Sequence, residues 1–302
     1  MTGDVPLLVG EERFLKLGDE SVAWSTVAGT FYDCPVNDFT VAFKPKRRNG
    51  QARTGNYQQR YAANVSGHCA GNLVTPLYGF ANLAQTLMTW GFTDQENKFP
   101  LSKSAQWVYV NHEDDKSFVG LRVNSATLAG SESGIILTLE LIGKSVTNGA
   151  VSGAAPPNSR NRLVEFLFED CTVSLGGTAI PISAFSWTVQ KNLSPIYHNS
   201  PSLISLPKTS FKETFSVTPL KEDATYDALR DALGMPELAG NLTVKGGDNA
   251  GHVVTCSVAF PRLSLIDSTE SGGIAVVENP LTFDVLKPDS SSTGSAMTWT
   301  TV

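Results

Sequence analysis

The stretch Pro35-Val36-Asn37-Asp38-Phe39-Thr40-Val41-Ala42-Phe43 decides the fold, because the chain contains a second stretch built on the same pattern. The second one reads Pro181-Ile182-Ser183-Ala184-Phe185-Ser186-Trp187-Thr188-Val189. Each begins at a proline and then places apolar side chains at alternate positions, which is the pattern of a half-buried β-strand. A repeated unit usually builds a surface or an assembly rather than a single catalytic cleft.

The parts that follow the two stretches also come in the same order. A polar, turn-rich excursion leads to an alternating strand, at residues 61–65 in the first half and 211–217 in the second. A short helix that ends at glycine follows, at residues 83–91 and 226–234. The hairpin turns that close the two halves read Glu132-Ser133-Gly134-Ile135 and Glu270-Ser271-Gly272-Gly273-Ile274. We therefore predict a mainly β protein with two homologous domains, each with a short flanking α-helix.

The remaining strands and the domain limits follow from local patterns. We expect further strands at residues 30–43, 106–110, 117–124, 135–142 and 163–173. A segment rich in Gly, Ala, Pro, Ser and Asn separates the halves and is the predicted linker. The predicted division is an N-terminal arm (1–29) that packs on a neighbouring chain, a first β domain (30–148), a linker (149–162), a second β domain (163–287) and a C-terminal tail (288–302).

The composition supports a β-rich chain whose surface is partly covered by partners. Of the 302 residues, 17% are charged, whereas about a quarter is usual in soluble proteins. The formal net charge of -6 argues against a protein that coats nucleic acid, because such proteins are basic. It is compatible with a protein that surrounds nucleic acid without gripping it, since like charges repel.

The four cysteines do not predict a disulfide framework, because they are few and have no paired spacing. The first residues lack the basic-then-apolar layout of a signal peptide. No apolar run approaches about 18 residues, so we expect no membrane partner. We expect the chain to be made and used in a cytosol.

The candidates for chemistry are weak, and we expect no enzyme, no metal and no cofactor. The cluster His112-Glu113-Asp114-Asp115 resembles a metal site, but its counterpart in the second half is an ordinary Gly-rich turn. His68 and Cys69 are adjacent, so on a strand their side chains point to opposite faces. The sequence contains no nucleophile elbow, phosphate-binding loop or dinucleotide fingerprint.

The two polar excursions are the candidate contact sites. The first is basic, and three interpretations remain open: an arm that meets an acidic neighbour, a solvated loop, or a nucleic-acid patch. The second carries apolar side chains, which on a long loop usually indicate burial against something. The predicted contact residues of the first excursion are Lys44, Lys46, Arg47, Arg48, Arg53 and Tyr57, and those of the second are Ile196, Tyr197, Leu203 and Ile204.

Several motifs of the second half resemble a known family. The stretch from Phe185 to Leu193 is similar to the strand and Asn-bearing turn of the tail tube proteins of long-tailed phages. The resemblance continues through Phe211-x-x-x-Phe215-Ser216-Val217, Leu233-Gly234, Phe260-Pro261-Arg262-Leu263, and Gly273-Ile274 leading to Leu281-Thr282-Phe283. It covers most of residues 165–286 and, more faintly, residues 30–142.

The resemblance implies tail-tube-like β-sandwich or barrel domains that form rings of six and stack into a hollow tube. Some members carry two domains in one chain and form trimeric, pseudo-hexameric rings, and this chain looks like that type. The implied partners are further copies of the chain, the distal initiator and terminator complexes, the tape measure protein in the lumen, and double-stranded DNA that passes without specific binding. The implied location is the virion tail, with assembly in the host cytoplasm.

Barrel geometry gives the same count independently. If each unit supplies four strands, six units give about 24 strands at a spacing of about 4.8 Å and a tilt of roughly 40°. The backbone diameter is then roughly 48 Å, which leaves a bore wide enough for duplex DNA after side chains are subtracted.

Two other classes of function remain open from the sequence. The first is a tandem β-sandwich binding module, for carbohydrate or a host surface, with Trp24, Trp107 or Trp299 as an aromatic platform. The second is an enzyme on a β scaffold, which requires His112 or His198 to meet carboxylates in a cleft.

Overall fold

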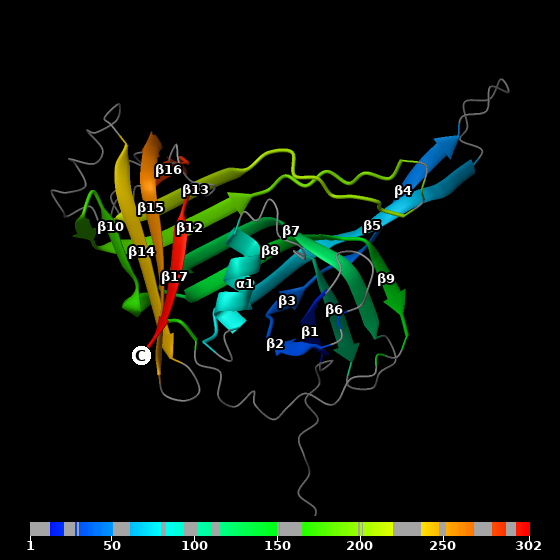
Figure 1. Ribbon diagram of the computed structural model, residues 1–302, viewed down its shortest axis with the longest axis horizontal. Helices are drawn as coiled ribbons and strands as arrows, with labels where there is room; N and C mark the ends of the chain where they lie inside the picture. Colours follow the sequence, from blue (N-terminus) through cyan, green and yellow to red (C-terminus); the bar gives the residue numbers. More distant parts are fainter. Residues whose placement is uncertain are drawn as a thin grey trace, which may run out of the picture.

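The computed structural model defines a chain built almost entirely of antiparallel β-strands (Figure 1). The residues that it describes are 13–20, 28, 30–50, 61–79, 83–93, 102–109, 115–149, 151, 165–198, 200, 202–219, 237–247, 252–268, 280–287 and 294–302. The predicted mainly β class is confirmed. The helix predicted at 226–234, the turn 270–274 and most of the linker lie outside these residues.

The strands of the first half are β1 (Arg13–Asp19), β2 (Tyr32–Cys34), β3 (Asp38–Phe39), β4 (Ala42–Gly50), β5 (Tyr61–Pro76), β6 (Lys103–Tyr109), β7 (Lys116–Ser131), β8 (Gly134–Gly143) and β9 (Ser145–Asn148). Those of the second half are β10 (Thr172–Leu175), β11 (Thr178–Ile180), β12 (Ile182–Gln190), β13 (Lys212–Pro219), β14 (Leu238–Gly247), β15 (Val253–Ser268), β16 (Leu281–Val285) and β17 (Ala296–Thr301). The helices are α1 (Leu83–Phe92) and the 3-10 turn η3 (Phe168–Asp170).

One unbroken path of paired strands runs through both halves. Its order is β4–β5–β8–β7–β12–β13–β16–β15, and each neighbouring pair is antiparallel. Figure 1 shows the two ends of this path, β4 and β15, on opposite sides of the molecule. The chain therefore contributes eight strands, four from each half, to a single curved sheet.

A second set of strands completes each half. In the first half, β2, β1, β6 and β9 gather on one end of the long strand β7, in the order β2–β1–β6–β7 with β9 also paired to β7. In the second half, β11, β10, β14 and β17 are arranged in the same way around β15. A 16-residue strand thus serves both sets in each half and ties them together.

The two halves repeat one pairing scheme. Seven antiparallel pairings of the first half have a counterpart in the second: β4–β5 with β12–β13, β5–β8 with β13–β16, β7–β8 with β15–β16, β6–β7 with β14–β15, β1–β6 with β10–β14, β1–β2 with β10–β11, and β7–β9 with β15–β17. Such agreement fixes which strand of one half corresponds to which strand of the other.

The irregularities of the sheet repeat as well. Strand β7 shifts register between Val123 and Ser125 where it pairs with β8, and β15 shifts between Leu265 and Asp267 where it pairs with β16. The second pair of positions stands 142 residues after the first. Bulges bend a strand and increase its twist, so the same bend is built into both long strands.

The two halves meet in a ladder between β7 and β12. Its register runs from Ala184 opposite Ser131 to Gln190 opposite Ser125. Gly130 leaves room for the ring of Phe185, which a Cβ at position 130 would overlap. On the other face, the hydroxyl groups of Thr127 and Thr188 lie 3.1 Å apart. Backbone pairing and side chains on both faces therefore hold the halves in one register.

Helix α1 covers this junction. It buries one face because leucine, methionine and aromatic side chains recur at three- and four-residue steps. Phe92 stacks on Trp187 with ring centroids 3.9 Å apart, and the Lys191 Nζ donates to the carbonyl oxygen of Trp90 at 3.1 Å. A cation at the carbonyl end of a helix is electrostatically favourable. A helix of the first half thus packs on a strand of the second.

Three local expectations differ from the structure. Residues 13–19, assigned to an arm that packs on a neighbour, form β1, whose Leu15 and Leu17 are buried in this chain's own core. The strand expected over 30–43 is divided into β2, β3 and the start of β4. Pro35 lies in the gap between β2 and β3, where it has no N–H to offer a ladder.

The third difference concerns residues 163–173, where one strand was expected. Residues 165–166 make isolated bridges, η3 follows, and β10 begins at Thr172. Phe166 is buried beside Gly246, whereas the ring of Phe168 packs on Phe185 with centroids 6.2 Å apart. Phe166 therefore packs on β14 and Phe168 on β12, and the chain turns at η3 to reach both strands.

The junction predicts a large effect for Trp187→Ala. The ring is 1% exposed, stacks on Phe92, and donates from Nε1 to Glu213 Oε1 at 2.8 Å. We expect the free energy of unfolding in urea to fall by about 3–5 kcal/mol, the usual range for a buried aromatic residue cut to alanine. Val253→Ala, at a strand position that is 50% exposed, is the control and should change it by less than about 0.5 kcal/mol. Equal effects would contradict this packing.

Candidate assembly surfaces

The first arm is the hairpin formed by β4 and the beginning of β5. It extends through Gly50, with Lys44 opposite His68 and Arg47 opposite Asn64. The basic excursion is therefore a strand over its first part, because the β4–β5 ladder continues beyond the core. Of the predicted contact residues, Lys44 is exposed and Lys46, Arg47 and Arg48 lie on β4, while Arg53 and Tyr57 lie outside the described residues.

Strand β4 has one free edge in the part of the chain that the structure describes. Its ladder partner is β5, and no described strand pairs with its other side. Phe43, on this strand, is 48% exposed, although its ring also covers Gly67. A strand edge with unpaired N–H and C=O groups and an exposed aromatic ring is a ready site for pairing with another chain.

The second arm consists of residues 191–210, between β12 and β13. Two isolated antiparallel bridges, Leu193 with Lys208 and Ile196 with Ser205, hold it as a narrow ribbon. Asn192 and His198 have φ values of 46°, in the left-handed region that asparagine adopts more readily than most residues. Figure 1 shows this ribbon running from the second half across to β4 and β5.

The second arm docks on the first half of its own chain. Leu203 is 1% exposed and packs in a small cluster with Ile142, Leu193 and Leu206. The guanidinium Nη1 of Arg122 donates to the carbonyl oxygen of Leu206 at 3.0 Å. Leu203 is therefore buried against its own chain, and its predicted contact with another subunit stays a prediction.

Of the other predicted contact residues of the second arm, one contacts the first half and two have side chains that are partly or largely exposed. The Tyr197 hydroxyl lies 2.7 Å from His68 Nδ1, on β5. Ile196 is half-buried, and Ile204 is 49% exposed. Within the chain, Tyr197 and Leu203 therefore contact the first half, and the predicted contacts of the arm with another subunit stay predictions.

Asn124 is a positioning residue that the sequence analysis missed. It occupies the bulge of β7, and its backbone oxygen accepts from Lys191 N at 2.8 Å. Its side-chain Oδ1 accepts from Leu193 N at 2.8 Å, and its Nδ2 donates to Glu140 Oε2 at 2.9 Å. These bonds fix the base of the second arm. Nothing in the sequence marks it, because an asparagine on a strand gives no signal of a distant partner.

The pair His68 and Cys69 has no catalytic arrangement. Cys69 is fully buried, and burial raises the pKa of its thiol to about 12, so it stays protonated at neutral pH. His68 faces Tyr197 instead, and its pKa is lowered by burial and, to a lesser degree, by the positive charge of Lys44. His112 lies outside the described residues.

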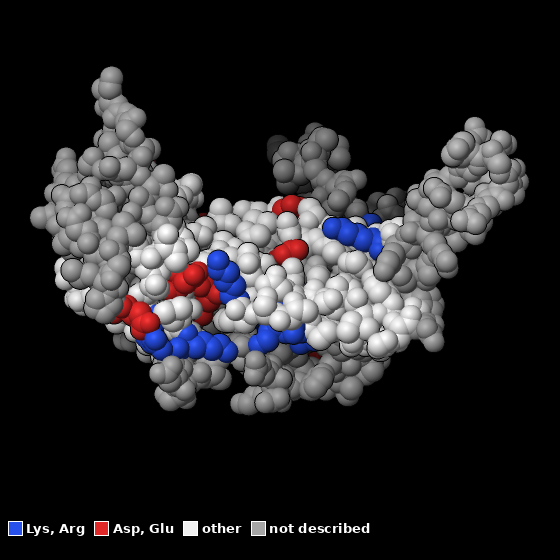
Figure 2. All heavy atoms as spheres, turned by 90° about the horizontal axis from the view of Figure 1, so that it is seen from above, with Lys and Arg blue, Asp and Glu red and all other residues white. Residues whose placement is uncertain are grey.

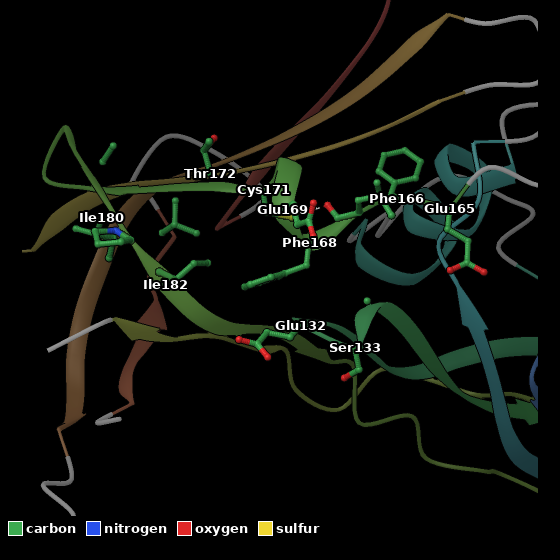
Figure 3. Close-up of a pocket in the computed structure, with 15 residues that line it drawn as sticks. Glu132, Ser133, Glu165, Phe166, Phe168, Glu169, Cys171, Thr172, Ile180 and Ile182 are labelled. Carbon is green, nitrogen blue, oxygen red and sulfur yellow. Dashed lines mark hydrogen bonds between the residues drawn. The ribbon is translucent and has the colours of Figure 1, made fainter. Parts of the chain in front are cut away.

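A groove of 790 Å³ lies between the β7–β8 turn and the segment that precedes β12. Glu132, Glu165 and Glu169 line it, but Figure 3 shows their carboxyl groups well separated and not directed at a common point. A general acid or base must lie within hydrogen-bond reach of the proton that it transfers, and paired carboxylates act from the two sides of one scissile bond. Within the described parts of the chain, no three His, Cys, Asp or Glu side chains are grouped to hold a metal ion.

Of the three tryptophans considered for an aromatic platform, the two that the structure describes, Trp107 and Trp299, do not lie together. Trp107 packs on Phe39, with ring centroids 5.2 Å apart, and Trp299 lies 6.4 Å from the ring of Phe166. Both are only partly exposed and pack against the core, each in its own half. Trp24 lies outside the described residues.

The surface charge is sparse and mixed. Among the described residues on the face shown in Figure 2, uncharged side chains predominate, with acidic and basic ones in small groups between them. No helix in the described ranges is both long and apolar enough to cross a membrane.

Docking of the second arm can be tested by substitution of two adjacent aliphatic residues, the buried Leu203 and the exposed Ile204. Leu203→Ala removes buried contacts that are typically worth about 2–5 kcal/mol. We expect chymotrypsin to cleave the arm, for example after Tyr197, more than about tenfold faster, because about 1.4 kcal/mol already changes an equilibrium tenfold. Ile204→Ala, next to it but 49% exposed, should leave the rate nearly unchanged. Similar rates for both variants would show that the arm is not docked.

The lowered pKa of His68, which burial and the nearby Lys44 cause, predicts a pH dependence of stability. The ordinary histidine pKa is about 6.5, and the folded state lowers it. The folded chain therefore binds fewer protons than the unfolded one below pH 6.5, so stability is complete above that value and decreases as the pH falls toward the lowered pKa. Urea unfolding at pH 7.5 and 5.5 should show a smaller loss for His68→Gln than for the wild type. An identical loss would exclude this contribution.

Comparison with known proteins gives one match and one negative result. A model of a phage tail tube protein family matches residues 10–285. The search of curated proteins finds no match. The matched range includes all strands from β1 to β16 in chain order, and therefore the whole strand path from β4 to β15.

Proposed function

Because this chain belongs to the phage tail tube protein family, we propose that it is a tail tube subunit of the duplicated-domain type, three copies of which close a ring. The family makes the chain a structural component of a virion tail that assembles with itself and with other tail proteins. In the proposal, the halves are two homologous domains, and each ring contains six similar units from three chains.

The observation that carries the proposal is the repeated pairing scheme. Each half contributes four strands to one path, in the order β4–β5–β8–β7 and then β12–β13–β16–β15. The step from one half to the next is a β-ladder between a first strand and a last strand. A step that joins similar units in this way can be repeated until the path closes.

The size of the closed path favours three chains. Three copies of an eight-strand path give 24 strands, and at a spacing of about 4.8 Å and a tilt of roughly 40° the backbone diameter is about 48 Å. Inward side chains reduce this by about 10 Å, which leaves a bore that admits duplex DNA. Closure also removes the two free edges of the path, which are otherwise prone to uncontrolled pairing.

Charge supports transit rather than binding. The chain carries a formal net charge of -6, and proteins that hold DNA by its phosphates do so with clustered basic residues. In the proposed tube, double-stranded DNA passes without specific contacts during ejection of the genome. The proposed partners are the initiator and terminator complexes at the two ends and the tape measure protein in the lumen, with assembly in the host cytoplasm.

Electron microscopy of the purified protein at increasing concentration tests the proposal. We expect rings and stacked tubes, with threefold symmetry and six similar lobes in each ring, because each 32.3 kDa chain supplies two units. Class averages with six chains to a ring would contradict the role of the duplication. Monomers at every concentration and salt condition, also after addition of pre-formed tube ends, would contradict the assembly itself.

A further inference from the structure

The ladder between β7 and β12 has no equivalent between the corresponding strands β15 and β4 among the described pairings. By the repeated pairing scheme, β4 corresponds to β12, and β15 corresponds to β7. Since β12 pairs with β7 inside the chain, the equivalent step joins β4 to β15. Figure 1 places these two strands at opposite sides of the molecule, so one chain cannot make this step with itself.

Both strands have the required edge free among the residues that the structure describes. Strand β4 pairs with β5 alone. At its end, β15 pairs with β16 through Asp267 opposite Thr282 and Ser268 opposite Leu281. Strands β14 and β17 pair with β15 only up to Leu263 and Ala259. The second side of Asp267 and Ser268 therefore has no described strand partner.

The register of the internal ladder transfers to these edges. Positions in β7 and β15 differ by 142, so Ser125 corresponds to Asp267 and Ala126 to Ser268. Leu73 of β5 matches Val217 of β13, because each is connected through one strand, by way of Leu139 and Leu281, to the matched positions Ala126 and Ser268. Phe39 stands opposite Leu73 and Phe185 stands opposite Val217, so Phe39 corresponds to Phe185.

The same spacing of 146 makes Phe43 the counterpart of Val189 and Lys44 the counterpart of Gln190. In the internal ladder, Val189 stands opposite Ala126 and Gln190 opposite Ser125. The transferred register therefore places Phe43 opposite Ser268 and Lys44 opposite Asp267.

Exposure and charge agree with this transfer. Val189, where the ladder is formed, is 0% exposed, whereas its counterpart Phe43, where the edge is free, is 48% exposed. The internal pair of Gln190 and Ser125 is uncharged, while the transferred pair of Lys44 and Asp267 has opposite charges. Opposite charges directly across an antiparallel ladder stabilise it, and like charges destabilise it.

We propose that the free edge of β4 pairs in antiparallel fashion with the end of β15 in the next copy of this chain, with Lys44 opposite Asp267 and Phe43 opposite Ser268. The inference rests on the proposed ring but adds its contact surface and register. The interface is heterologous, because two different edges meet, so repetition of it produces a closed ring or an open filament according to the angle at each step.

Paired cysteines test the register. The variant Lys44→Cys with Asp267→Cys places two thiols at facing positions, where Cα atoms of an antiparallel ladder stand about 4.5–5.5 Å apart, within the range that a disulfide spans. After assembly and mild oxidation, we expect covalent dimers and trimers on a denaturing, non-reducing gel. The matched control is Gln190→Cys with Ser125→Cys, at the internal ladder, which should close within one chain and give no covalent oligomer.

The two single variants control for the native cysteines, of which Cys34, Cys69 and Cys256 are buried and Cys171 is partly exposed. Rings or tubes in the microscope without cross-linked oligomers would overturn this junction and leave the proposed function intact. Absence of rings from the wild-type protein would overturn the proposed function itself.

A charge exchange decides the case in which the cysteine pair does not assemble. Lys44→Asp alone and Asp267→Lys alone each place like charges opposite one another and should reduce ring formation. The double exchange restores opposite charges and should recover it. If the double variant assembles no better than either single variant, Lys44 does not stand opposite Asp267.

Discussion

The structure depends on one β-ladder, in which residues 184–190 of β12 pair with residues 125–131 of β7. This ladder joins the halves, makes one sheet of eight successive strands, and brings Trp187 under helix α1. Side-chain contacts on both faces stabilise this ladder. On one face the ring of Phe185 covers Gly130, and on the other face the hydroxyl groups of Thr127 and Thr188 lie within hydrogen-bond distance. A shift of one residue would turn every side chain to the opposite face, so this register leaves little freedom to the halves.

The two halves agree in their backbone pairing more closely than in their side chains. The register shifts of β7 and β6 recur in β15 and β14 at corresponding places. Bulges set local twist and bending, so the corresponding strands of the two halves bend in the same way. A residue on the sheet needs only to keep its place in the alternation of buried and exposed side chains. The order and spacing of the strands therefore repeat in the two halves, although few residues are identical.

The two arms illustrate how equal positions acquire different chemistry. The second arm is apolar and docks in its own chain, where Leu203 is buried and Tyr197 meets His68. The first arm carries the basic residues of β4 and ends the strand path at an edge that no described strand covers. Internal contacts form at once during folding and can be apolar. Charge on an edge strand disfavours uncontrolled pairing with other strands, and Lys44 is exposed on β4.

The sequence by itself determined the mainly β class and helix α1, because alternation and helical spacing are local properties. The contact role of the two arms stays a prediction. It did not determine that residues 13–19 belong to the core, that residues 163–173 turn at η3, or that Leu203 is buried while Ile204 is exposed. Only the tertiary structure decided which strands pair, that Asn124 fixes the base of the second arm, and that β7 meets β12. The physical reason is that a period-two pattern states which face of a strand is buried, but not which distant strand lies along its edge.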